Sequence, residues 1–222
     1  MLKDKDIREP LFDFLEETYG KIRILEEKTM GRSRADAVMV TENALYGIEI
    51  KSDADTYARL QRQVKDYDLY YDFNYAVVGT SHALHVGEHL PDWWGIITAE
   101  LEEGRVDFYI LRKPLPNPGV NRSRQLSLLW RTELLQIQEQ NRLPLYREKS
   151  KLFVQKKLLD HVPDTLLQHQ ICGALFERDY TLIQEQIEAF RAQKTKGGRA
   201  GKVRKSGKDR KAGSVIRGRS KA

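Results

Sequence analysis

The chain has 222 residues, 40% of them hydrophobic and 32% charged, which fits a globular protein with one ordinary domain and an accessory region, or two small domains. Its apolar runs are too short to span a bilayer, and its first residues do not form a secretory signal. A single cysteine, Cys172, excludes an intrachain disulfide and a cysteine-based zinc site. These features predict a cytoplasmic protein with no membrane partner.

The net charge of +6 is unevenly distributed along the chain. Residues 194–222 contain 12 Lys and Arg residues and one acid, a net charge of +11, so the first 193 residues carry −5. Because this tail has almost no large apolar residues, it is predicted to be disordered and to attract polyanions without sequence preference.

Helical and strand patterns alternate through the first half of the chain. Apolar residues recur at helical spacing over residues 6–19. Three short segments rich in Val and Ile follow, and they predict a meander of strands over residues 22–28, 34–41 and 45–51. A second helix is expected after Ser52-Asp53, because apolar residues recur at three- and four-residue spacing from Tyr57 to Tyr71. Further strands are predicted at residues 75–79, 95–99 and 106–111.

A proline-rich break separates this region from a helical one, at Pro114, Pro116 and Pro118. Helices are predicted beyond it over residues 126–140, 151–161, 163–176 and 180–193. The sequence therefore predicts an α/β core followed by a small all-helical region and a basic tail. The expected divisions are a core domain at 1–112, a linker at 113–123, a helical module at 124–193 and the tail at 194–222.

Three residues on the second and third predicted strands are candidates for chemistry. Glu49 and Lys51 are two apart and therefore share a strand face, and Asp36 lies on the preceding strand, which is expected to be adjacent. Two carboxylates held together repel each other unless a cation neutralises them, and Mg²⁺ or Mn²⁺ prefers such oxygen ligands. With a lysine beside it, such an ion can activate water and stabilise charge on a phosphate. These residue types match the requirements of phosphodiester hydrolysis.

The order of these residues also resembles a known family. Asp36, followed after 12 residues by Glu49-x-Lys51 on a run of helix, three strands, helix and strand, is similar to the PD-(D/E)XK nuclease superfamily. The resemblance covers roughly residues 4–100, and Ala35 stands where the family has a proline. It implies a restriction-endonuclease-like core in which Asp36 and Glu49 bind Mg²⁺ or Mn²⁺ and Lys51 is catalytic. A lone Glu-x-Lys pair is more often an exposed strand face, but the joint order and spacing favour catalysis.

Gln63 and Tyr67 form Gln-x-x-x-Tyr on the second predicted helix, as in the RecB-like branch of the family. The segments Arg-Ala-Asp-Ala-Val and Glu-Ile-Lys-Ser-Asp also resemble a group of small bacterial and phage members. Four residues apart, Gln63 and Tyr67 share a helical face and would support the metal cluster or contact the DNA backbone. Arg59, one turn earlier, would reach a phosphate. The alternatives are a core tyrosine for Tyr67 and a solvated charge for Arg59.

The family often supplies a further acidic ligand from its N-terminal helix. Glu9 is the preferred candidate for this metal ligand, and Glu16 is the alternative on the same helix. Glu27, on the first predicted strand, is a third candidate.

Histidine and tryptophan clusters have simpler interpretations. His82, His85 and His89 are three and four residues apart, which are spacings that occur in zinc sites. A glycine and a proline interrupt that stretch, so the histidines are interpreted as loop or cleft-edge residues. Trp93 and Trp94 follow Pro91 and are expected to pack under the edge of the sheet rather than stack on bases.

These observations predict a Mg²⁺-dependent enzyme that hydrolyses DNA, with a role in repair, phage biology or defence. Two alternatives stay open: a nucleic-acid-binding module on the same fold without catalysis, and an RNA nuclease, since the metal chemistry does not depend on the 2′-OH. Keeping two repelling carboxylates together argues against the inactive module. The oligomeric state is open, with a dimer as one option.

Overall fold

The computed structural model describes residues 4–52 and 56–178. The predicted helix at 180–193 and the predicted disordered tail at 194–222 lie outside the described residues. The chain divides into two units, Met1–Arg178 and Asp179–Ala222, and all described elements belong to the first. No helix within these described ranges is long and apolar enough to cross a membrane.

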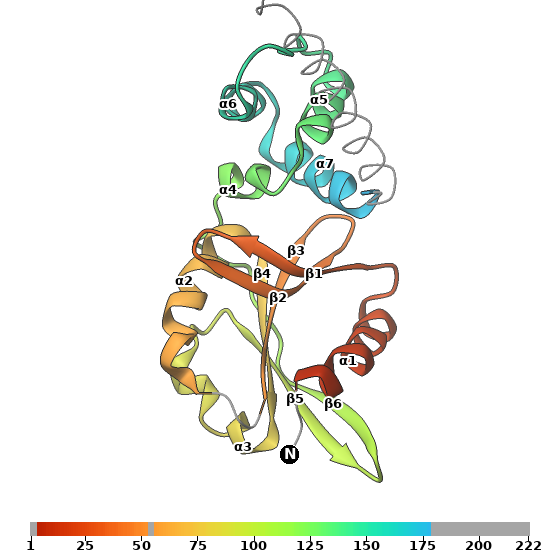
Figure 1. Cartoon of the computed structure of the whole chain (residues 1–222), viewed down its shortest axis with the longest axis vertical. Helices are drawn as coiled ribbons and strands as arrows, with labels where there is room; N and C mark the ends of the chain where they lie inside the picture. Colours follow the sequence, from red (N-terminus) through yellow and green to blue (C-terminus); the bar gives the residue numbers. More distant parts are fainter. Residues whose placement is uncertain (1–3, 53–55, 179–222) are drawn as a thin grey trace, which may run out of the picture. The chain divides into compact units, whose positions relative to one another are not determined.

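The first unit is a mixed α/β fold built on a six-stranded sheet with the strands in sequence order (Figure 1). The strands are β1 (Arg23–Met30), β2 (Ser33–Val40), β3 (Leu45–Lys51), β4 (Phe73–Gly79), β5 (Gly95–Glu102) and β6 (Arg105–Arg112). β1, β2 and β3 form an antiparallel meander, β3, β4 and β5 run parallel, and β6 returns antiparallel to β5. The predicted meander and the three later strands are therefore confirmed.

Helices cover both faces of the sheet, with α1 and α2 on opposite sides (Figure 1). The helical segments are α1 (Asp4–Tyr19), η1 (Tyr57–Arg59), α2 (Leu60–Tyr70), α3 (Thr80–Ala83), η2 (Val86–His89), α4 (Arg122–Ser127), α5 (Arg131–Gln140), α6 (Lys151–His161) and α7 (Asp164–Phe176). The helices predicted at 6–19, 151–161 and 163–176 are confirmed, and the helix expected after Ser52-Asp53 begins at η1.

The alternation of side chains along β3 decides what each face of the sheet carries. The α1 side packs around a stripe formed by Ile7, Leu11 and Leu15. Ile48 and Ile50 of β3 belong to this cluster. Because successive strand residues point to opposite faces, Glu49 and Lys51 lie on the other face, beneath α2.

The single helix predicted at 126–140 is wrong, because the structure has two helices there, α4 and α5. The chain leaves helical geometry at Trp130, whose φ and ψ are −80° and 165°. Glu133 Oε2 accepts the N–H of Trp130 at 2.6 Å and so begins α5 anew. The apolar residues Leu128 and Leu129 continue the periodic pattern through the break, so periodicity alone did not mark it.

The helices after the proline-rich segment share a hydrophobic core with α2 and the sheet. Members of this cluster from α4, α6 and α7 are Leu126, Val154, Leu158 and Ile171. Residues 113–121 contain no helix or strand, and Asn117 in this segment donates to the carbonyl oxygens of Asp68 (2.8 Å) and Tyr71 (2.7 Å). Arg122 lies 3.4 Å from Asp72 and 2.9 Å from Asp164, so it links α2's end to α7.

Candidate functional site

The two candidate carboxylates meet where β2 and β3 stop pairing. The last paired positions of these strands are Ala37 and Ile48, and Asp36 and Glu49 are the next residue on each strand beyond that pair. Asp36 Oδ2 accepts the N–H of Ile50 at 2.9 Å. This hydrogen bond holds the Asp36 side chain over β3 on the same face as Glu49.

Glu49 is held by three donors in a buried position, with 1% of its surface exposed. Lys51 Nζ lies 2.6 Å from Glu49 Oε1. Gln63 Nε2 donates to the same oxygen at 2.5 Å, and Gln63 Oε1 accepts from Lys51 Nζ at 3.3 Å. The Tyr67 hydroxyl donates to Glu49 Oε2 at 2.7 Å. The structure thus brings Gln63 and Tyr67, from α2, to the Glu49–Lys51 pair.

Tyr67 is also a core residue, fully buried among the apolar side chains under α2. Its hydroxyl lies 3.0 Å from the carbonyl oxygen of Ile48 and 3.4 Å from the N–H of Asp36. Burial, together with the charges of Glu49 and Asp36, raises the pKa of Tyr67 well above its usual value, so the hydroxyl stays protonated. The neutral Tyr67 hydroxyl can therefore hydrogen-bond to the backbone of β2 and β3 and to the Glu49 carboxylate.

The Asp36 carboxyl lies in an unfavourable place for a negative charge. Burial and the neighbouring charge of Glu49 raise the pKa of Asp36 to about 7, although the Ile50 N–H and the Arg8 guanidinium oppose this. Two carboxylates in a partly desolvated site repel each other, and a bound cation would relieve the repulsion.

Arg8 is a site residue that the sequence did not reveal. Its Nη1 donates to the carbonyl oxygen of Asp36 at 3.1 Å, and its Nη2 lies 3.7 Å from Asp36 Oδ1. Asp4, one turn earlier on α1, accepts from Arg8 Nε at 2.7 Å. The four-residue spacing on α1 accounts only for the local pair with Asp4, whereas the contact with Asp36 depends on how α1 packs on the sheet. Glu9, the preferred acidic ligand, is exposed and does not line the site.

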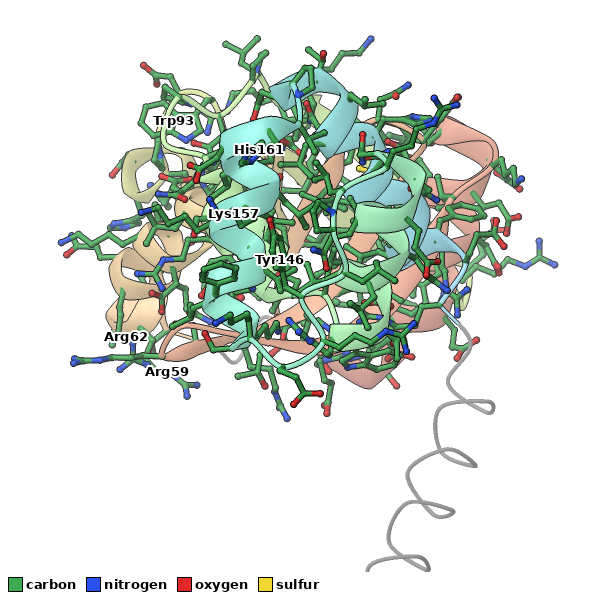
Figure 2. All side chains as sticks on the ribbon, turned by 90° about the horizontal axis from the view of Figure 1, so that it is seen from above. Arg59, Arg62, Trp93, Tyr146, Lys157 and His161 are labelled. Atoms are coloured by element: carbon green, nitrogen blue, oxygen red, sulfur yellow. The ribbon has the colours of Figure 1, made fainter. Side chains whose placement is uncertain are left out.

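The cluster lies at the floor of an open cleft of about 450 Å³. Its lining comes from α1, the β1–β2 hairpin, β3, η1 and α2, and comprises Asp4, Arg8, Glu27, Arg32, Ser33, Arg34, Asp36, Glu49, Ile50, Lys51, Arg59, Arg62 and Gln63. Arg59, the candidate phosphate contact, lines the cleft, and Arg62, which the sequence analysis did not single out, lines it three residues later. Figure 2 labels both at one edge of the molecule, where the side chains of Arg59, from η1, and Arg62, from α2, project outward. Glu27 lies on the cleft, 3.1 Å from Arg34, whereas Glu16 is exposed elsewhere on α1.

The carboxylates fit a hard divalent cation that keeps much of its water. Within residues 4–52 and 56–178, no group of three or more His, Cys, Asp and Glu side chains is arranged to hold a metal ion. Mg²⁺ commonly needs only one or two carboxylates besides water and substrate oxygens. Asp36 Oδ1 receives no hydrogen bond in the described structure, since Arg8 Nη2 stays 3.7 Å away. The three donors on Glu49 leave room for one further bond, because a carboxylate accepts about four.

The histidine and tryptophan clusters lie outside this cleft. His82 Nδ1 lies 2.9 Å from the Tyr57 hydroxyl, and the His89 and Tyr57 rings are 4.3 Å apart. Trp94 is fully buried, and the indole N–H groups of Trp93 and Trp94 both donate to the Asp68 carboxylate, at 3.2 and 2.9 Å. The predicted packing of Trp94 is confirmed.

The fold and the cleft define a mixed α/β protein with a buried carboxylate–lysine–glutamine cluster open to solvent on one side. Residues 1–197 match the model of the family described as bacteriophage P4 protein cII. The match spans most of the chain, so the protein belongs to this family. Comparisons with curated proteins and with solved structures found no match.

Proposed function

We propose that this protein is a metal-dependent nuclease of the PD-(D/E)XK kind that hydrolyses phosphodiester bonds in DNA. The observation that carries the proposal is the cluster of Asp36, Glu49 and Lys51 on one face of the sheet, at the floor of an open cleft. A purely structural ion pair would not need a second carboxylate beside it whose pKa is raised to about 7.

The order of elements supports a restriction-endonuclease-like core. α1, β1, β2, β3, α2 and β4 follow one another as helix, three strands, helix and strand, with β3 parallel to β4. The contacts of Gln63 and Tyr67 with Glu49 support assignment to the RecB-like branch, whose Gln-x-x-x-Tyr pattern these residues match.

Each residue has a defined task in this proposal. Asp36 and Glu49 would hold Mg²⁺ or Mn²⁺, which when bound activates water and stabilises charge on the phosphate. Gln63 and Tyr67 fix the orientation of the Glu49 carboxylate. Lys51 presents its ammonium group at the same place, where it can orient the attacking water and neutralise charge that develops on the phosphate oxygens.

The test is cleavage of plasmid and linear DNA in the presence of Mg²⁺ or Mn²⁺. We expect the parent chain to cut, and Asp36→Asn and Lys51→Ala each to reduce the rate by at least about 100-fold. Asp36→Asn weakens the cation site, and Lys51→Ala removes the group that stabilises charge on the phosphate. Matched controls are Asp107→Asn and Lys113→Ala, which remove the same charges from exposed positions outside the cleft.

The proposal fails if the parent does not cleave any DNA substrate, or if both cleft variants cut at the rate of their controls. If only RNA were cleaved, the proposed substrate would change from DNA to RNA, and the proposed catalytic site would stay the same. Thermal melting of every variant distinguishes a lost activity from a lost fold.

A further inference from the structure

Three arginines at the mouth of the cleft lack the acidic partners that the other cations there have. Arg32, Arg59 and Arg62 are exposed and line the cleft. Within the part of the chain that the structure describes, none of their guanidinium groups makes an ion pair or a hydrogen bond, whereas the Arg34 guanidinium lies 3.1 Å from the Glu27 carboxylate. Their charge is therefore available to a partner.

The turn that carries Arg32 is fastened to α2, the helix that carries Arg62. Arg59 and Arg62 are three residues apart along η1 and α2 and so point to the same side. Arg32 sits in the turn between β1 and β2, and this turn is fastened to α2 on both sides. The Gly31 N–H donates to the Tyr70 hydroxyl at 3.1 Å, and Ser33 Oγ lies 2.5 Å from Asp66 Oδ2.

Holding three like charges around one opening costs free energy unless an anion binds there. A small anion would be better served by donors that converge in a buried pocket. These guanidinium groups are exposed and come from two separate segments, which suits an extended polyanion with regularly placed charges. Arginine is also well matched to phosphate, because its planar fork can donate two parallel hydrogen bonds.

The part of the cleft lined by α1 and β1 differs in charge, which favours one path for a polyanion. Asp4 and Glu27 line it from α1 and β1, and the nearby cations Arg8 and Arg34 pair with acids. A polyanion is therefore favoured along the α2 side of the cleft and not along the α1 side.

We infer that Arg32, Arg59 and Arg62 form a phosphate-binding rim that holds the backbone of duplex DNA along the α2 side of the cleft. The rim contacts phosphates and not bases, so binding is independent of sequence. This inference rests on the proposed function only for the step that delivers a phosphodiester to Asp36 and Glu49; the binding itself requires neither metal nor hydrolysis.

The test measures binding of the full-length chain to a short labelled DNA duplex in EDTA, over a series of salt concentrations. Each phosphate contact contributes about 0.9 to the slope of log affinity against log salt. We expect Arg32→Gln, Arg59→Gln and Arg62→Gln each to reduce the slope by about 0.9, and the triple variant by about 2.7. The matched control is Arg105→Gln, an exposed arginine on β6 outside the cleft, which should leave the slope unchanged.

The tail is present in every variant, so its contribution cancels in these comparisons. A slope that is the same in the parent and the triple variant overturns the inference, as does an equal reduction in Arg105→Gln. Stronger binding of an RNA duplex, with the rim variants affecting RNA alone, overturns the assignment to DNA. A parent that cleaves DNA but shows no rim dependence removes this inference alone, whereas rim-dependent binding without cleavage removes the proposed function alone.

Discussion

Gln63 connects the two charged groups of the cluster, since its amide donates to Glu49 and accepts from Lys51. We predict that Gln63→Leu lowers the cleavage rate by about 10- to 100-fold, the usual cost of losing a residue that orients a metal ligand. The fold should survive, because Gln63 lies at the cleft and is only half-buried.

Steady-state cleavage and thermal melting measure the two effects separately. Gln61→Leu is the matched control, because Gln61 is exposed two positions earlier on α2 and does not line the cleft. Equal rates for the two variants would show that Gln63 has no positioning role.

Asp36 should give the metal-free protein a characteristic dependence of stability on pH. Its pKa is about 7 in the folded chain, against about 4 for an ordinary aspartate. Between these values the folded state holds a proton that the unfolded state releases, so the free energy of unfolding falls as pH rises and levels off above about pH 7.

We predict that Asp36→Asn flattens this dependence. The variant should match the parent near pH 4 and exceed its stability at about pH 8, because a pKa difference of one corresponds to about 1.4 kcal/mol. Urea unfolding in EDTA at both pH values measures the difference. A parent whose stability rises between them, with no change in the variant, would contradict the raised pKa.

Part of the site could be predicted from the sequence, because strand geometry is local. The two-residue alternation placed Glu49 and Lys51 on one face, and helical spacing placed Gln63 and Tyr67 together. Arg8 could not be predicted, because its contact with Asp36 joins two elements whose packing depends on the whole sheet. The position of Glu9, exposed and outside the cleft lining, could not be predicted for the same reason, because local spacing does not give the rotation of α1 about its axis.

At the scale of elements, the close packing of β3 against α2 sets the position of Tyr67. A Cβ on Gly47 would lie 2.3 Å from Tyr71 Cδ2, 2.5 Å from Tyr67 Cδ1 and 2.7 Å from Asn74 Oδ1. We predict that Gly47→Ala lowers the free energy of unfolding by roughly 3 kcal/mol, the upper end of overpacking costs, because two buried rings must move. The displaced Tyr67 would also release Glu49, so the cleavage rate per folded molecule should fall.

Gly173→Ala is the control of opposite sign. Nothing lies within 4 Å of a Cβ at this position in α7, so alanine should stabilise the helix by about 0.5–1 kcal/mol. Chemical unfolding measures both variants. A Gly47→Ala protein as stable as the parent would show that α2 can shift away from β3 without cost.

Elements were predictable where their pattern was continuous and bounded by breaks. The strands of the meander, β4 and β5 are short segments with several apolar residues each, bounded by Gly or polar residues, and the predicted strands agree with the structure. The division between α4 and α5 was missed because the apolar pattern continues through Leu128 and Leu129, and because the Glu133 side chain that caps α5 is also held by Arg178, 45 residues away. A side chain with a distant partner leaves no local signal.

At the scale of the molecule, one buried ion pair ties the end of the described chain to its middle. The Arg178 guanidinium donates from Nε and Nη2 to the two Glu133 oxygens, both at 2.6 Å, and to the Leu128 carbonyl oxygen at 3.0 Å. Its Cζ lies 3.9 Å from the centre of the Trp130 ring. The Arg178 carbonyl oxygen in turn accepts from Arg23 Nη2 at 2.6 Å, which links the helical region to β1.

Removing one partner of this ion pair should lower the stability more than replacing both partners with apolar residues. We predict that Arg178→Ala lowers the free energy of unfolding by about 3–5 kcal/mol, because the buried Glu133 carboxylate loses its partner. The double variant Arg178→Met, Glu133→Leu should recover most of this loss, since it leaves no buried charge unpaired. A helical region that opened independently of the sheet would instead give a second, separate unfolding transition in Arg178→Ala. A single transition shifted to lower denaturant, by circular dichroism and by tryptophan fluorescence alike, is the result expected if the sheet and the helices after it unfold as one unit.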